Sequence, residues 1–227
     1  MEQYQNPLFT IDNVLFTVAQ AELKVLLVKR AIEPFIDQWS LPGGFVDPQL
    51  DASVEACARR KLQEKTGVAP SYLEQLKVFS GHERDPRGFA VTLAFYALMG
   101  EQAAQSHIDT VHDAQWLPVH QLQHYSLAFD HHAIIAEAVA RLKQKALYSL
   151  VPVYCLPAQF TVTELMTVIE AIIERPIQRK SLMRRIEASD MFIAVDEKVS
   201  TGKRPAQLYQ LKPDADIYLF ERNLTIE

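Results

Sequence analysis

The sequence predicts an α/β domain followed by a smaller domain of two helices and a strand hairpin. Over the first hundred residues, short β-rich runs alternate with a helical pattern. Residues 150–157 then contain two prolines and no charged residue, which suits an extended connector. After this segment, two helical patterns precede two strand-like runs. These observations place the α/β domain at residues 1–150 and the second domain at residues 151–227.

The composition is that of an ordinary globular protein. The chain has 227 residues, of which 48% are hydrophobic and 22% charged, enough for one large domain or two small ones. The longest apolar run, residues 89–99, is about half of the ~20 residues that a membrane-spanning helix needs. The N-terminal residues lack the pattern of a secretion signal, and the two cysteines form no disulfide framework or metal cluster. We therefore expect a cytoplasmic protein without a membrane partner.

The strands of the first domain are expected from its β-rich and apolar runs. Residues 14–19 and 23–29 are separated by a short polar turn, which predicts a hairpin. Residues 91–98 suit a buried strand, and residues 114–118 another. Residues 39–44 are expected to form a loop, and its glycines let the backbone approach a partner closely.

Two helices are expected in the first domain, at residues 52–65 and from Asp130 onward. Gly67 lies just past the first helix and suits a C-terminal cap. His131 and His132 are adjacent and therefore point apart on a helix, so we expect no zinc site there. The positions expected to be buried recur at helical spacing: Val54, Ala58 and Leu62 in the first helix, and Ile134, Ile135, Ala138 and Leu142 in the second.

A glycine pair and the helix that follows it resemble the Nudix box, the motif of a family of hydrolases. The motif is a Gly-Gly loop, a helix with Arg-Glu-apolar-x-Glu-Glu, and a closing glycine; here Gly43 and Gly44 precede residues 59–67. The loop is longer than in the motif, and Ala52 stands where its first glutamate would be. The resemblance covers residues 10–145 and implies a Nudix α/β/α sandwich with a mixed sheet.

Two lysines replace catalytic glutamates in this box. Aligning Gly67 with the closing glycine puts Arg60 on the motif's arginine and Glu64 on the first of its paired glutamates. Lys61 and Lys65 take the places of the other two. These positions share a helix face, where Nudix hydrolases need carboxylates to hold Mg²⁺. We therefore expect no hydrolysis, no metal site and no required cofactor. The alternative is an active hydrolase, an ADP-ribose pyrophosphatase with an appended domain.

The first domain is nevertheless expected to keep a pocket for an anionic ligand. Arg84 and Arg87 lie on a predicted loop, where they suit a diphosphate or a ribose; a polar surface turn is the alternative. Trp39 and Phe45 are candidate adenine stackers, with packing as the alternative. The expected ligand-binding residues are Trp39, Gly43, Gly44, Phe45, Arg60, Glu64, Arg84 and Arg87.

The second domain has the order of a winged helix-turn-helix. Thr161 and Glu164 form a capping-box pattern that begins a helix, and Pro176 ends it. A second helix extends to about Ser189, and two strand-like runs then flank residues 200–205. The first helix carries an apolar stripe at Leu165, Val168, Ile169, Ile172 and Ile173, and the second is expected to bury Leu182, Met183 and Ile186.

A local excess of positive charge suggests that this second domain binds DNA. The chain has a net charge of −5, yet residues 175–204 hold eight cations against four anions. Because phosphate contacts dominate DNA affinity, such an excess suits a DNA-facing surface, although a solvated helix face or a protein-interaction winged helix is the alternative. The expected DNA-binding residues are Lys180, Ser181, Arg184, Arg185, Thr201, Lys203 and Arg204.

The chain resembles the NrtR family of Nudix-related transcriptional regulators. The resemblance is carried by residues 202–209, residues 160–165 and the altered Nudix box. The resemblance spans nearly the whole chain. It implies a homodimer that represses NAD-biosynthesis genes by binding double-stranded operator DNA. It also implies that ADP-ribose in the Nudix pocket is the effector that releases the operator.

Overall fold

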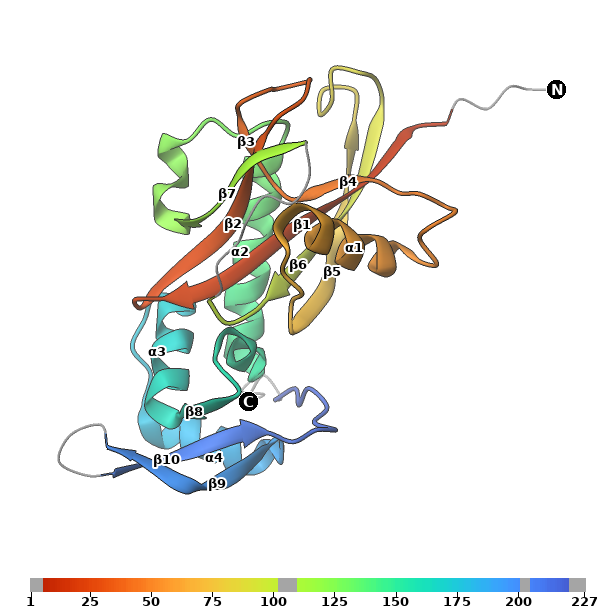
Figure 1. Cartoon of the computed structure of the whole chain (residues 1–227). Coiled ribbons are helices and arrows are strands. Elements are labelled where there is room, and N and C mark those ends of the chain that lie inside the picture. The colour runs from red at the N-terminus through yellow and green to blue at the C-terminus, as the bar shows by residue number, and fades with distance from the viewer. Residues whose placement is uncertain (1–5, 102–109, 201–204, 221–227) are drawn as a thin grey trace, which may run out of the picture. The chain divides into compact units, whose positions relative to one another are not determined.

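The structure, a computed structural model, describes residues 6–101, 110–200 and 205–220 (Figure 1). The chain forms two compact units, one of residues 1–17 and 24–139 and the other of residues 18–23 and 140–227. The division falls inside helix α2 (His131–Tyr148), earlier than the boundary predicted at residue 150. Because this helix is continuous across the division, the boundary between the domains stays a prediction.

The first unit is built around a mixed sheet. Strands β1 (Leu8–Ala19) and β2 (Glu22–Arg30) are neighbours in it, as the predicted hairpin requires. β1 also pairs in parallel with β6 (Ala90–Leu98), the predicted apolar strand, and antiparallel with β4 (Gly43–Phe45). In the described residues the sheet has seven strands, ordered β3-β2-β1-β6-β5, with β4 on β1 and β7 on β2; β3 is Trp39–Ser40, β5 is Tyr72–Gly81 and β7 is Val111–Pro118.

Two local features differ from the sequence-based expectation. The predicted loop at residues 39–44 contains the short strands β3 and β4, because their backbones find partners on β2 and β1. Helix α1 (Val54–Thr66) begins two residues later than predicted, because Ser53 caps it by accepting a hydrogen bond from the backbone N–H of Ala56. The predicted cap at Gly67 is confirmed: its φ is 70°, and its N–H donates to Gln63 O.

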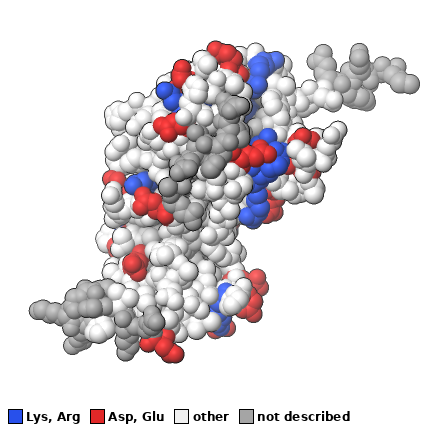
Figure 2. Space-filling model, viewed as in Figure 1, with Lys and Arg blue, Asp and Glu red and all other residues white. Residues whose placement is uncertain are grey.

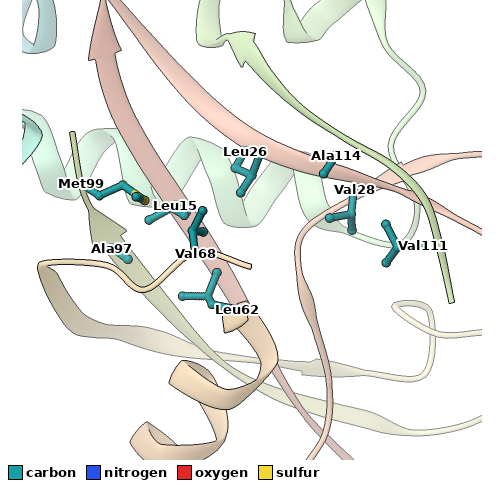
Figure 3. Packing of buried hydrophobic residues seen from close by; sticks show 9 residues of the cluster. All are labelled: Leu15, Leu26, Val28, Leu62, Val68, Ala97, Met99, Val111 and Ala114. Carbon is teal, nitrogen blue, oxygen red and sulfur yellow. The ribbon is translucent and has the colours of Figure 1, made fainter. Parts of the chain in front are cut away.

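Helices cover both faces of this sheet (Figure 1). Leu62 of α1 is fully buried in an apolar cluster with residues of β1, β2, β6 and β7 (Figure 3). The N-terminal half of α2 covers the opposite face and buries Ile134, Ile135 and Ala138, as predicted. A short 3₁₀ helix, η1 (Val119–His124), connects β7 to the segment before α2. The cluster consists of Leu15, Leu26, Val28, Leu62, Val68, Ala97, Met99, Val111 and Ala114.

The second unit has the helix and strand order that was predicted for it. The capping box is confirmed: the Thr161 side chain accepts from Glu164 N–H, and the Glu164 carboxylate accepts from Thr161 N–H. All five positions of the predicted stripe are buried. None of the helices described is both long and apolar enough to cross a membrane. The elements are η2 (Val151–Cys155), β8 (Gln159–Thr161), α3 (Val162–Ile173), α4 (Arg179–Ser189), β9 (Phe192–Ser200) and β10 (Pro205–Leu211), and the sheet order is β8-β10-β9.

Candidate functional site

A charged cavity of about 270 Å³ opens in the first unit, between strands β1, β2 and β4, helix α1, the β5–β6 connection and the start of α2. Among the residues that the structure describes, its walls carry five cationic and three anionic side chains, an excess of two positive charges with histidine neutral. Such a site favours an anionic ligand. The cationic lining residues are Arg30, Lys61, Lys65, Arg84 and Arg87, and the anionic ones are Asp12, Glu64 and Asp85.

The glycine pair lets the backbone of β4 lie directly against its neighbours. A Cβ atom at Gly43 would lie 2.2 Å from Ile11 O and 2.6 Å from Asp12 Oδ1, closer than any real contact. Gly44 has a φ of +148°, which side chains rarely allow, and a Cβ there would lie 3.5 Å from Lys61 Cε. Gly43 therefore lets β4 lie directly against Asp12, and Gly44 provides a backbone conformation that other residues rarely adopt.

A buried ion network forms one end of the cavity. Arg84 is 8% exposed, and its guanidinium donates to Asp12 Oδ2 at 3.1 Å and to Asp130 Oδ1 at 2.9 Å. Burial would raise the pKa of the Asp12 carboxyl, but His131 and Arg84 together outweigh that effect and hold this pKa below its usual range. Asp12 therefore stays ionised and fixes the arginine.

His131, the first residue of α2, is held from both sides. Its Nδ1 accepts a hydrogen bond from the backbone N–H of Leu41 at 2.9 Å, and its Nε2 lies 3.6 Å from Asp12 Oδ1. Because Nδ1 accepts this hydrogen bond, the N–H group of the ring is at Nε2, on the side of the Asp12 carboxylate. Among the described residues, no group of three or more His, Cys, Asp or Glu side chains could hold a metal ion.

Helix α1 presents one charged face to the cavity. Lys61, Glu64 and Lys65 all line it, as expected of positions that share a helix face. Lys61 Nζ lies 3.7 Å from Glu64 Oε2. Burial, with the neighbouring charges of Arg30 and Lys61, lowers the pKa of Lys65 to about 8. Figure 2 shows Lys and Arg side chains beside Asp and Glu side chains over this helix.

The donor set on α1 does not fit Mg²⁺. This ion prefers several oxygen ligands in octahedral geometry. Glu64 supplies the carboxylate here, and its Oε1 already accepts from Arg60 at 2.8 Å. The other two charged groups that α1 places in the lining are the ammonium groups of Lys61 and Lys65, which repel a cation. The helix is therefore suited to bind phosphate directly and unsuited to bind the metal.

Six of the eight predicted ligand residues line the cavity: Gly43, Gly44, Phe45, Glu64, Arg84 and Arg87. The guanidinium of Arg87 pairs with Asp85 at 2.7 Å and lies 5.2 Å from the centre of the Phe45 ring. This arrangement gives the rim of the cavity one cationic and one aromatic surface.

Two predicted ligand residues, Trp39 and Arg60, lie outside the described lining of the cavity. The backbone of Trp39 pairs with Lys29 on β2, and its side chain is half-buried. Arg60 donates to both carboxylate oxygens of Asp51, at 2.7 and 2.6 Å, and so holds the segment that precedes α1.

Several lining residues were not predicted from the sequence, above all Asp12, Arg30, Phe129 and His131. Asp12 could have been recognised as a candidate from the sequence, because it is a carboxylate within a mostly apolar strand, β1. The Arg30 guanidinium lies 5.0 Å from the centre of the Phe129 ring, a contact between segments far apart in the chain. No local pattern predicts such a pair.

In the second unit, α4 exposes Lys180, Ser181 and Arg184 to solvent. Arg185 is different: its guanidinium donates to Leu147 O at 2.7 Å and lies 5.0 Å from the centre of the Phe220 ring. Burial lowers the pKa of this arginine. The predicted face is therefore divided, with Arg185 turned toward its own unit. The remaining predicted contacts, Thr201, Lys203 and Arg204, lie outside the described residues.

Comparison with known proteins agrees with this two-part architecture. Residues 10–141 match the NUDIX domain, and residues 152–211 match the NrtR DNA-binding winged helix domain. The chain is 41% identical to the ADPR responsive transcriptional repressor NtrR of Acinetobacter baylyi, over 91% of this chain and 83% of that protein. The chain belongs to the NrtR family.

Other relatives of this NrtR-family chain include a regulator and a hydrolase. NrtR of Shewanella oneidensis, solved with a 27mer DNA, is 48% identical with a TM-score of 0.88, over 96% of this chain and 99% of that one. Its NUDIX domain, solved with ADP ribose, is 46% identical with a TM-score of 0.60, over 61% and 90%. The ADP-ribose pyrophosphatase of Methanocaldococcus jannaschii is 33% identical, over 59% of this chain and 74% of that protein.

Proposed function

We propose that this NrtR-family chain is a transcriptional repressor whose winged helix binds operator DNA and whose Nudix unit binds ADP-ribose as the releasing effector. One observation carries the proposal. A cavity lined by Lys61, Lys65 and three arginines occurs in the same chain as a winged helix with an exposed basic face. The first feature suits an anionic signal, and the second suits a phosphate backbone. NAD-biosynthesis genes are the targets that the family resemblance implies.

On the DNA side, the exposed residues of α4 are the proposed readers of the operator. Lys180, Ser181 and Arg184 would enter the major groove, where arginine can pair with guanine. We propose Arg185 as a residue that positions α4, because its guanidinium already binds Leu147 O. Thr201, Lys203 and Arg204 remain proposed contacts at the tip of the hairpin.

We also propose that the chain acts as a homodimer. A symmetric dimer presents two recognition helices, which must match two half-sites separated by whole turns of DNA of about 10–10.5 bp. A palindromic operator follows from this symmetry. A monomer would instead bind a single half-site with much lower affinity.

On the effector side, the cavity walls supply the proposed contacts to ADP-ribose. Lys61, Lys65 and Arg87 offer charge for the diphosphate, and Phe45 offers a ring face for stacking. Arg84 is held by Asp12 and Asp130, so it contributes a fixed positive charge at the inner end. We assign Trp39 and Arg60 structural roles outside the contact surface.

The Nudix unit is proposed to bind without hydrolysing. Hydrolysis by Nudix hydrolases requires acids that hold Mg²⁺. The two ammonium groups of α1 cannot bind this ion, so its stabilisation of the transition state is lost. Similarity to the ADP-ribose pyrophosphatase of Methanocaldococcus jannaschii makes hydrolysis of ADP-ribose the second candidate function. Mass spectrometry for AMP after incubation with Mg²⁺ and ADP-ribose separates the two, because AMP at enzymatic rates supports the hydrolase alone.

Fluorescence anisotropy tests the regulatory proposal. A labelled promoter fragment from an NAD-biosynthesis operon is titrated with the full chain, with and without ADP-ribose. We expect saturable binding that weakens steeply as salt is raised, and release of the DNA by ADP-ribose. Binding that ADP-ribose leaves unchanged would remove the effector role. Absence of salt-dependent binding would favour a protein-interaction winged helix.

A further inference from the structure

We propose that the ammonium groups of Lys61 and Lys65 replace the divalent cation as direct partners of the effector's diphosphate, so that the cavity binds ADP-ribose without a metal. The inference rests on the proposed function and goes beyond it. The proposed function gives a chain that binds ADP-ribose without hydrolysing it. It does not by itself say which groups neutralise the diphosphate.

The positions of the two lysines support this exchange. Both line the cavity from one face of α1, and the Lys61 side chain lies within ordinary contact distance of Gly44 in strand β4. Its distance of 3.7 Å from Glu64 is longer than a hydrogen bond, so this contact leaves its N–H groups available to an anion. Glu64 itself is held by Arg60. The helix therefore presents positive charge where the family motif presents acids.

The charge of the cavity supports it as well. The described part of the lining carries more cations than anions, which suits a diphosphate diester that carries one negative charge on each phosphate. Lys65 lies near two other cations, Arg30 and Lys61, and their repulsion contributes to its lowered pKa. An anion between these groups would relieve that repulsion. A divalent cation at the same place would increase it.

The direct test is calorimetry of ADP-ribose binding to the full chain in EDTA and in Mg²⁺. We expect dissociation constants that agree within about twofold. A loss of affinity of tenfold or more in EDTA would overturn the inference while leaving the proposed effector intact. No binding in either condition would instead overturn the effector itself, and the inference with it.

Charge variants on α1 provide the second arm. Lys61→Met and Lys65→Met keep the aliphatic stem and should each weaken binding in EDTA at least fivefold. Arg59→Met removes one cation from the same helix outside the described lining, where Arg59 pairs with Glu55, and should change affinity less than twofold. Unchanged affinity in both lysine variants would contradict the proposal. Thermal denaturation checks folding, and Lys61→Met alone decides the matter if Lys65→Met fails to fold.

Replacing both lysines with glutamate distinguishes the proposal from a simple loss of positive charge, because it should make ADP-ribose binding depend on Mg²⁺. The double variant Lys61→Glu with Lys65→Glu restores acids at both altered positions. We expect it to bind ADP-ribose weakly in EDTA and at least fivefold more tightly in Mg²⁺. Binding as tight as that of the unaltered chain in EDTA would show that the ammonium groups are not the diphosphate's partners.

Discussion

The guanidinium of Arg84 lies 3.1 Å from Asp12 Oδ2, and both side chains are almost entirely buried. The same guanidinium reaches Asp130, the residue before helix α2, so it joins strand β1 to the start of that helix. A ligand that draws on the charge of Arg84 would therefore act on two elements at once. The network connects one wall of the cavity to the N-terminal end of α2.

Removing Arg84 should destabilise the first unit strongly. Arg84→Ala leaves Asp12 buried without its arginine, and breaking a buried pair in this way costs about 3–5 kcal/mol of the free energy of unfolding. Urea denaturation measures it. Arg59→Ala, which breaks an exposed pair on α1, should cost less than about 1 kcal/mol and serves as the control. Equal, small effects of both variants would contradict the structural role of the network.

Two neighbouring arginines of α4 should respond differently to substitution. Arg184→Ala should weaken operator binding by about 1–3 kcal/mol, roughly 5- to 150-fold, without lowering the melting temperature. Arg185→Ala should lower the free energy of unfolding by about 1 kcal/mol, because Leu147 O loses its donor. Anisotropy and thermal denaturation report the two effects separately. An Arg184 variant that binds operator normally would show that α4 is not the recognition helix.

ADP-ribose affinity should fall as the pH rises through about 8. Lys65 is charged below its pKa of about 8, and the groups that act on it are Arg30 and Lys61, which repel its charge, and Asp12 and Glu64, which favour it. A diphosphate favours the charged form and raises the pKa in the complex, so binding takes up a proton above pH 8. One linked proton gives at most about a tenfold change per pH unit.

Calorimetry in buffers of different ionisation enthalpy measures this proton uptake. Lys65→Arg keeps its charge at all of these pH values, so its affinity should be flat between about pH 7 and 9. A dependence on pH that survives in this variant would assign the proton to another group.

Much of the fold could be predicted because its signals are local. The capping box at Thr161, the cap at Gly67 and the period of the α3 stripe each depend on residues within a few positions of one another. The start of α1 was misplaced by two residues because Ser53 competes with Ala52 as the boundary, and only the cap hydrogen bond decides between them. Boundaries depend on such single contacts.

The site was predicted less completely for a related reason. Arg84 and Asp12 are 72 positions apart in the chain, so only the assembled sheet brings them together. Arg185 was different, because it lies three residues after the buried Leu182 and therefore on a neighbouring part of the helix surface. That spacing was available in the sequence and would have separated it from Arg184.

The most direct test of the account is the affinity of ADP-ribose measured by calorimetry with and without operator DNA. If the effector releases DNA because it favours a different state of the protein, the operator must weaken effector binding by the same factor. We expect a dissociation constant about 5- to 150-fold higher in the presence of saturating operator. Equal dissociation constants would contradict the account, because the two sites would then be uncoupled.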